Sequence, residues 1–310
     1  MPSSDGPRSP SDPGEGSRSA LPHEEPRHEE PPRPGGSVAS GCRLRLDVSY
    51  DGSGFHGFAE NDGVRTVAGE LRGALERVLR APVELTCAGR TDTGVHARGQ
   101  VVSIVSEVAA PDVDRVRDAL NGLLGPAVVT RSVRSVPDDF DARFSAEWRR
   151  YRYLVLDRDV PDPFLAATSW WVPRVLDLAA MDVAASHLVG EHDFSSFCRR
   201  PRGDREVSLV RRVLAAGWTR EAVGAGDAEP ARFEITATAF CHQMVRSIVG
   251  ALVAVGSGRW APSQVAQLLD ARDRTGAPNL APPHGLTLWH VGYEPWPAGA
   301  DEGRDPHLLV

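Results

Sequence analysis

The chain has 310 residues, of which 41% are hydrophobic and 25% charged, with a formal net charge of −7, a composition that excludes a wholly disordered, collagen-like or coiled-coil protein. No apolar run approaches the roughly 18 residues that a membrane span needs. The N-terminus lacks the apolar core of a secretory signal, so we expect a cytoplasmic protein without a membrane partner.

Residues 1–40 are rich in Pro, Ser and Gly and nearly devoid of large apolar side chains, which predicts a disordered tail. From Cys42 onward, apolar and polar residues alternate with the period of a half-buried strand. Thr66 is a candidate helix N-cap before an apolar pattern of helical spacing that ends before Pro82, and Asp112 opens a second helix. The elements predicted in this half are strands at 42–50, 83–88, 99–105 and 128–136 and helices at 66–79 and 112–123.

The second half repeats the order strand, helix, strand, strand, helix, strand. Its predicted elements are strands at 148–156, 207–218, 231–240 and 286–293 and helices at 177–189 and 242–256. A helix at 262–270 and a loop at 157–176 are insertions on this plan.

A repeat of topology without a repeat of sequence predicts an α+β fold. We expect two ferredoxin-like βαββαβ halves whose antiparallel sheets join side by side around a central catalytic cleft. The predicted parts of the chain are the disordered tail at 1–40, an N-terminal half at 41–140 with the catalytic loop, a C-terminal half at 141–293 and an acidic tail at 294–310.

The charges and cysteines limit the chemistry further. The two tails carry most of the acidic excess, so the net charge does not argue against a polyanionic partner. None of the 35 basic residues is lysine, which excludes a Schiff-base or phosphate-loop lysine. The cysteines lack CxxC or CxxH spacing, so we expect buried free thiols and neither a zinc site nor a disulfide framework. They are Cys42, Cys87, Cys198 and Cys241.

The most informative stretch is CAGRTDTGVHARGQV at 87–101. It places Asp92 between two glycines in a loop that joins two strands, where a backbone can approach a ligand closely. On composition alone, the favoured interpretation of Asp92 is an Asx-turn residue that serves its own loop, and Arg90 and Arg98 could equally be solvated surface charges. The loop lacks the lysine and the helix of a Walker motif, which disfavours nucleotide triphosphate binding.

This loop resembles the signature of the TruA family of tRNA pseudouridine synthases, GRTDxGVHAxxQV. The similarity covers residues 42–293, with further motifs in the family's order. They are YDGSGFHGF at 50–58, RTVAGEL at 65–71, FDARFSAEWRRYRY at 140–153, LVGEHDFSSF at 188–197 as the end of the third helix, CHQMVRSIVGAL at 241–252 and APPHGLTLWHVGY at 281–293.

The resemblance implies an enzyme that isomerises uridine to pseudouridine at positions 38, 39 and 40 of the tRNA anticodon arm, without a cofactor or metal. Asp92 is then the nucleophile, adding to C1′ of the ribose or C6 of the uracil, and Arg246 is the arginine that pairs with it. Tyr151 matches the family's active-site tyrosine, and Arg90 an arginine that enters the RNA where the target base leaves it. The family also implies a homodimer in which each tRNA touches both subunits.

Without the resemblance, these residues have plainer interpretations. Arg246 is a surface arginine at the edge of an apolar helical stripe, and Tyr151 and Tyr153 are core aromatics of a strand. The segment 199–212 has a net charge of +4. This charge fits a loop that contacts phosphates, and it equally fits a solvated loop with no partner. The histidines are interpreted as structural, because no two have metal-ligand spacing; they are His96, His192 and His242.

Departures from the family pattern at Phe58, Ala59, Arg65 and Thr93 remove no group that the chemistry needs, but they leave substrate scope open. Two other functions were weighed. An RNA-binding or tRNA-folding protein without turnover is disfavoured because Asp92, Tyr151 and Arg246 occur together. A carboxylate-based nucleoside hydrolase is disfavoured because glycoside hydrolysis usually needs a second carboxylate.

Overall fold

The computed structural model describes residues 41–108, 110–200, 207–220 and 229–297. The predicted disordered tail at 1–40 lies outside these residues, as does most of the predicted acidic tail. Within the described residues, no helix combines the length and the apolar character needed to cross a membrane.

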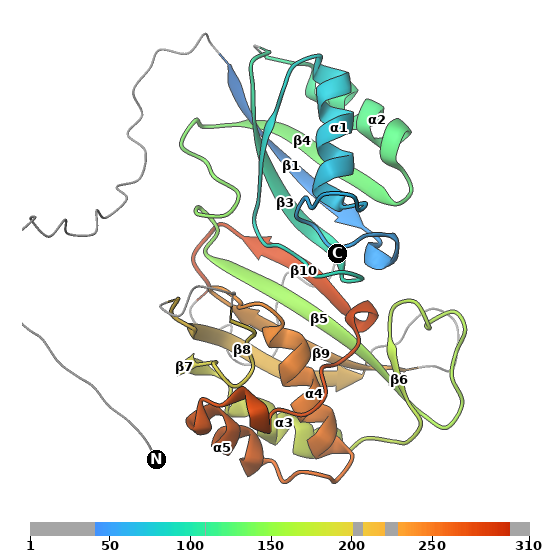
Figure 1. Ribbon diagram of the computed structural model, residues 1–310, viewed down its shortest axis with the longest axis vertical. Helices are drawn as coiled ribbons and strands as arrows, with labels where there is room; N and C mark the ends of the chain where they lie inside the picture. Colours follow the sequence, from blue (N-terminus) through green and yellow to red (C-terminus); the bar gives the residue numbers. More distant parts are fainter. Residues whose placement is uncertain (1–40, 109, 201–206, 221–228, 298–310) are drawn as a thin grey trace, which may run out of the picture. The chain divides into compact units, whose positions relative to one another are not determined.

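Ten strands of the described chain form one sheet, in the order β4-β1-β3-β10-β5-β9-β8-β7, with β2 beside β3 and β6 beside β5 (Figure 1). The strands are β1 (Cys42–Tyr50), β2 (Glu84–Cys87), β3 (His96–Ser106), β4 (Val128–Val136), β5 (Trp148–Asp157), β6 (Trp170–Val172), β7 (Gly190–Asp193), β8 (Val210–Arg220), β9 (Ala231–Ala237) and β10 (Leu286–Gly292). The α-helices are α1 (Val67–Leu79), α2 (Val113–Leu124), α3 (Leu178–Ser186), α4 (Met244–Gly256) and α5 (Ser263–Ala271). The coarse prediction of a mixed fold with helices on a large sheet is confirmed.

Side-chain caps start three of the helices where polar residues precede an apolar pattern. The Thr66 hydroxyl accepts a hydrogen bond from Gly69 N (3.2 Å), and the Asp112 carboxylate accepts one from Arg115 N (3.1 Å). Asp177 caps α3 in the same way. Such caps satisfy backbone donors that have no partner inside the helix. The helix starts predicted at Thr66 and Asp112 are therefore confirmed.

The strands of the two halves follow a similar order in the sheet. In the first half the order is β4-β1-β3-β2, and in the second half it is β10-β5-β9-β8. The pairs within these two groups are antiparallel. Helix α2 contacts α1 and β4, while α3 contacts α4 and β8. The apolar helix α4 is buried along nearly its whole length, as expected for a helix that is hydrophobic on all sides.

The two groups of strands meet where β3 and β10 run parallel. His96 lies opposite Thr287 and Ala97 opposite Leu288. Farther along, β3 pairs with β2 instead. Gly99 permits the close approach, because a Cβ there would lie only 2.4 Å from the carbonyl oxygen of Trp289. The loop between β2 and β3 therefore begins and ends beside the line where the halves join.

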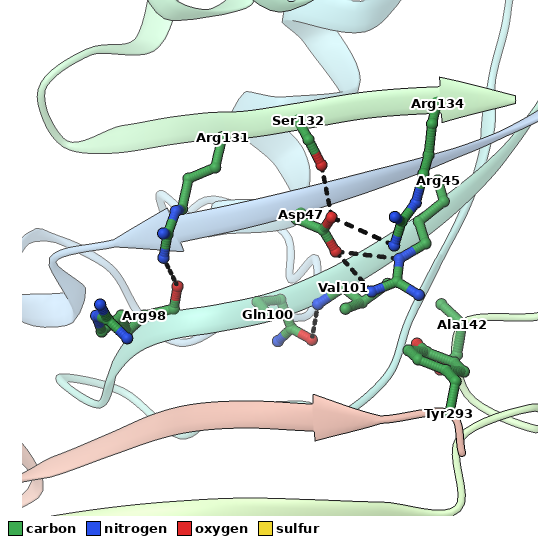
Figure 2. Close-up of polar contacts among 10 residues, drawn as sticks. All are labelled: Arg45, Asp47, Arg98, Gln100, Val101, Arg131, Ser132, Arg134, Ala142 and Tyr293. Carbon is green, nitrogen blue, oxygen red and sulfur yellow. Dashed lines mark hydrogen bonds and ion pairs between the residues drawn. The ribbon is translucent and has the colours of Figure 1, made fainter. Parts of the chain in front are cut away.

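Polar side chains link β1 and β4 in the first half (Figure 2). The Arg45 guanidinium donates to Asp47 Oδ1 through two nitrogens (3.0 and 2.8 Å), and Ser132 Oγ donates to Asp47 Oδ2 (2.5 Å). Arg45 also lies over the Tyr293 ring, 4.4 Å from its centroid. The Tyr293 hydroxyl donates to the Ala142 carbonyl (2.8 Å). This cluster anchors the segment between β4 and β5.

Four details of the predicted elements differ from the structure. The helix predicted at 177–189 ends at Ser186, and the segment 188–197 contains the short strand β7 rather than a helix end. Gly190 has φ +112°, a value incompatible with a helix, and the following residues pair with β8. The helix predicted from 242 begins at Met244, because Gln243 adopts a left-handed conformation with φ +65°. The inserted loop at 157–176 contains β6.

Candidate active site at the join of the two halves

A cleft of about 850 Å³ lies at the join and is lined by residues of both halves. All four residues that the sequence selected, Arg90, Asp92, Tyr151 and Arg246, line it. Arginines and aromatic rings make up much of the wall around Asp92. The other charged or aromatic lining residues include His56, Phe58, Arg143, Arg149, Arg199, Arg211, Phe240 and His242.

The loop that carries Asp92 is braced from below by the segment after β1. Phe58 N donates to the Thr91 carbonyl (3.0 Å), and the hydroxyls of Tyr50 and Thr91 are hydrogen-bonded at 2.7 Å. Gly57 has φ +94°, and a Cβ there would lie 2.9 Å from the Thr91 carbonyl oxygen. A side chain at this position would push the loop away, so glycine is required for the close contact. Gly57, Phe58 and Thr91 themselves line the cleft, so these contacts fix the loop within the cleft wall.

Asp92 and Arg246 face each other across the join. Asp92 Oδ2 lies 3.6 Å from an Nη of Arg246, whose side chain is only 13% exposed. Arg246 Nε donates to the Ala281 carbonyl (2.8 Å), which holds the guanidinium in place. The pairing expected from the sequence is present, but through one nitrogen rather than the two of a bidentate contact.

The sequence analysis interpreted His242 as structural, whereas the structure places it beside Asp92 in the cleft. Its Nε2 lies 3.3 Å from Asp92 Oδ1, so the two carboxylate oxygens face different cationic or donor groups. The His242 carbonyl accepts from Arg199 N (3.0 Å), and the Gln243 side chain accepts from Arg274 (2.7 Å). These bonds hold the chain in its turn into α4. Its place four residues before Arg246, in the motif at 241–252, was a signal that could have linked it to the site.

Tyr151 is buried, with 8% of its surface exposed, and forms an edge-to-face contact with Phe240 at a centroid distance of 5.0 Å. Burial, helped by Tyr50 and Asp92, raises the pKa of Tyr151, so its hydroxyl remains protonated near neutrality. Tyr153 is fully buried and donates from its hydroxyl to the Pro282 carbonyl (2.8 Å). The core interpretation of Tyr153 is confirmed, whereas Tyr151 also lines the cleft.

Arg149 forms hydrogen bonds to several chain segments around the cleft. The sequence analysis did not single it out. Its guanidinium donates five hydrogen bonds to backbone carbonyls, two of them to Ala88 just before the loop of Asp92. Another reaches Thr238 at the end of β9 (2.9 Å). Burial lowers the pKa of Arg149. These hydrogen bonds connect β5 to the start of the Asp92 loop and to the end of β9, so Arg149 holds these parts of the site together.

Some of the other residues singled out in the sequence lie at the cleft, and others lie outside the described residues. Arg90 is exposed at the cleft, and Arg199 and Arg211 of the arginine-rich segment also line it. Arg202 and Arg205 lie outside the described residues. His96 is buried and accepts from Gly52 N through Nδ1 (3.1 Å), as a structural histidine does. Among the described residues, no three His, Cys, Asp or Glu side chains are grouped as a metal site.

Comparison with known proteins adds to this geometry. The tRNA pseudouridine synthase family matches residues 48–145 and 184–294. Proteins named tRNA pseudouridine synthase A are 46% identical in Frankia casuarinae, over 82% of this chain and 90% of theirs, and 42% identical in Leifsonia xyli subsp. xyli, over 84% and 94%. A third, from Streptomyces avermitilis, is 43% identical over 81% and 88%.

Among solved structures, an archaeal box H/ACA sRNP Nop10-Cbf5 complex matches with a TM-score of 0.30 and 14% identity, over 71% of this chain and 45% of that one. The family match includes the loop of Asp92 and the helix of Arg246, and it leaves out residues 146–183, which contain Tyr151. The chain belongs to the tRNA pseudouridine synthase family.

Proposed function

We propose that this chain isomerises uridine to pseudouridine at positions 38, 39 and 40 of the tRNA anticodon arm, with Asp92 as the nucleophile. The observation that carries this assignment is the Asp92 carboxylate, which lies in a cleft between His242 on one oxygen and Arg246 on the other. The names of the curated relatives supply the substrate class.

The reaction breaks the bond from C1′ to N1 and forms one from C1′ to C5. Nitrogen N1 gains a proton and C5 loses one, so electrons and atoms balance without a redox partner. Asp92 adds to C1′ or to C6 and leaves again in the second half of the reaction. A carboxylate suits both steps, since it is a nucleophile when ionised and an acceptable leaving group afterwards.

The other residues have roles that follow from their places. Arg246 keeps a cation beside the carboxylate in a partly buried site, where the charged form of an acid needs one. Tyr151 presents a protonated phenol to an extruded uracil, which aromatic rings bind by stacking. The exposed Arg90 at the cleft is suited to enter the RNA where the uridine leaves it.

The same proposal includes the finer features of the fold and assembly. Each group of four strands is interpreted as a ferredoxin-like half, divided near residues 140 and 141, in the segment between β4 and β5. We expect a cytoplasmic homodimer in which both subunits contact one tRNA, because an L-shaped tRNA extends well beyond one cleft. Size determination by light scattering with and without tRNA tests the assembly.

The activity is tested with purified protein and unmodified tRNA transcripts that carry a single uridine at 38, 39 or 40. The expected result is pseudouridine at each of the three positions, measured by mass spectrometry of nucleosides. A transcript with cytidine at all three positions is the control and should yield none. Binding of tRNA without any pseudouridine would instead support an RNA-binding protein of the same fold.

A further inference from the structure

One exposed aromatic residue beside the cleft is not explained by the fold or by the chemistry at Asp92. Phe144, in the segment between β4 and β5, is 80% exposed. Phe140, in the same segment, packs instead on Tyr293 with ring centroids 5.1 Å apart. Burial of a phenylalanine stabilises a fold, and an exposed one contributes little, so the outward position of Phe144 has no role in the core.

The backbone around Phe144 is held rigidly. Asp141 Oδ1 accepts hydrogen bonds from Arg143 N (2.8 Å) and Phe144 N (2.9 Å). Ser145 closes the turn, because Ser145 N donates to the Asp141 carbonyl and Asp141 N donates to Ser145 Oγ, both at 3.0 Å. The turn is therefore ordered before any ligand arrives, which lowers the entropic cost of binding there.

Arg143 connects this ring to the cleft. Its guanidinium carbon lies 5.3 Å from the centroid of the Phe144 ring, within the range of a cation–π contact, and Arg143 itself lines the cleft that holds Asp92. The Arg143 carbonyl accepts from the buried Arg149 guanidinium (2.6 Å). Phe144 thus lies beside a residue of the cleft wall, in a turn that Arg149 holds through the Arg143 carbonyl.

We propose that Phe144 and Arg143 form a stacking platform for an unpaired base of the substrate tRNA, next to the uridine that enters the cleft. An exposed ring beside a guanidinium is the combination that binds single-stranded RNA, with the ring stacking on a base and the arginine contacting a phosphate. A base that has lost its stacking neighbour to the cleft needs such a surface. The inference rests on the proposed function, since the occupant is a tRNA base.

The test measures tRNA affinity in the Asp92→Asn background, where the substrate is not consumed. Phe144→Ala and Phe144→Leu should weaken binding of the unmodified tRNA by about tenfold, the loss of one base stack. Phe144→Trp keeps a flat ring and should remain within about twofold of the parent. Stacking should also quench the added tryptophan's fluorescence when tRNA is titrated.

Phe164→Ala is the matched control. Phe164 is 93% exposed, but it lies in the segment between β5 and β6, and its sequence neighbours do not line the cleft as Arg143 does beside Phe144. We expect its replacement to leave tRNA affinity unchanged. Equal effects of Phe144→Ala and Phe164→Ala, or equal affinity of the Leu and Trp variants, would overturn the platform while leaving the proposed function intact.

Two other outcomes also decide the matter. If Phe144→Ala changes the oligomeric size of the protein but binds tRNA as tightly as the parent, the ring belongs to a subunit contact. That result would overturn the platform. A parent protein that binds no tRNA at all would overturn both the platform and the proposed function. Far-UV circular dichroism of each variant confirms that the fold is retained.

Discussion

Asp92 and Arg246 come from opposite halves of the sheet and meet at 3.6 Å, with the arginine held on its other side by the Ala281 carbonyl. Asp92 lies on the loop before β3, and Arg246 lies on α4. Their contact therefore depends on how the two groups of strands pack together. The contact couples assembly of the halves to the charge that the carboxylate needs.

We expect Arg246→Gln to lower turnover by about 100-fold, because it leaves a partly buried carboxylate without its cation. Arg246→Lys should recover only part of the loss, since an ammonium group cannot contact both Asp92 and the Ala281 carbonyl as the guanidinium does. Single-turnover rates measure both effects. Arg117→Gln, at an exposed ion pair of α2, is the control and should match the wild type; a fully active Arg246→Gln would remove Arg246 from the mechanism.

Asp92→Asn should reduce pseudouridine formation by at least about 1,000-fold, because an amide of the same shape is a poor nucleophile. Binding of tRNA should remain within about twofold, since the backbone of the loop is held by Phe58 and not by the carboxylate. Nucleoside analysis and filter binding of the same preparations measure the two quantities. More than a few per cent of wild-type turnover would exclude Asp92 as the nucleophile.

His242→Ala should lower turnover by about tenfold, because it removes a polar group that lies 3.3 Å from the Asp92 carboxylate. His242→Gln retains an N–H donor and should recover most of this activity. The melting temperature should not change, because half of the His242 side chain is exposed to solvent. His187→Ala, at an exposed position after α3, is the matched control. Equal losses in the Ala and Gln variants would mean that hydrogen bonding to Asp92 is not what His242 supplies.

The cysteines should differ in reactivity. A hydrogen bond with Cys198 lowers the pKa of Cys241, whereas burial raises the pKa of Cys87 to about 11. At pH 8, roughly one in a thousand Cys87 thiols is therefore ionised, and the thiolate is the reactive form. We expect iodoacetamide to label Cys241 first, as followed by peptide mass spectrometry over time. Bound tRNA should slow this labelling, because Cys241 lines the cleft; faster labelling of Cys87 would contradict the assignment.

Helix starts and strand faces could be predicted from short stretches of the sequence. The caps at Thr66 and Asp112 and the alternation in β1 predicted elements that the structure contains, because a cap or a strand face depends on nearby residues. The short strand β7 was not predicted, since its four residues are in a strand only because β8 lies beside them. The motif at 87–101 located Asp92 for a different reason, namely its resemblance to a known family.

The surroundings of Asp92 could not be predicted in the same way. Arg149 acts through carbonyl groups of Ala88 and Thr238, which are brought together only by the sheet, and no pattern near Arg149 marks these contacts. His242 reaches Asp92 because Gln243 turns the chain with a positive φ before α4 begins. Non-glycine residues rarely adopt this conformation, so propensity argued for an earlier helix start instead.

The central position of β10 has a consequence for synthesis of the protein. The last strand along the chain lies in the middle of the sheet, between β3 and β5, and pairs with both. A nascent chain on the ribosome therefore has a gap between the two sets of strands until residues 286–292 have emerged. The loop of Asp92 and the helix of Arg246 are both translated earlier, yet they remain unjoined during this time. A truncated product that stops before β10 would lack a completed cleft around Asp92, so translation through Gly292 is itself a condition for activity.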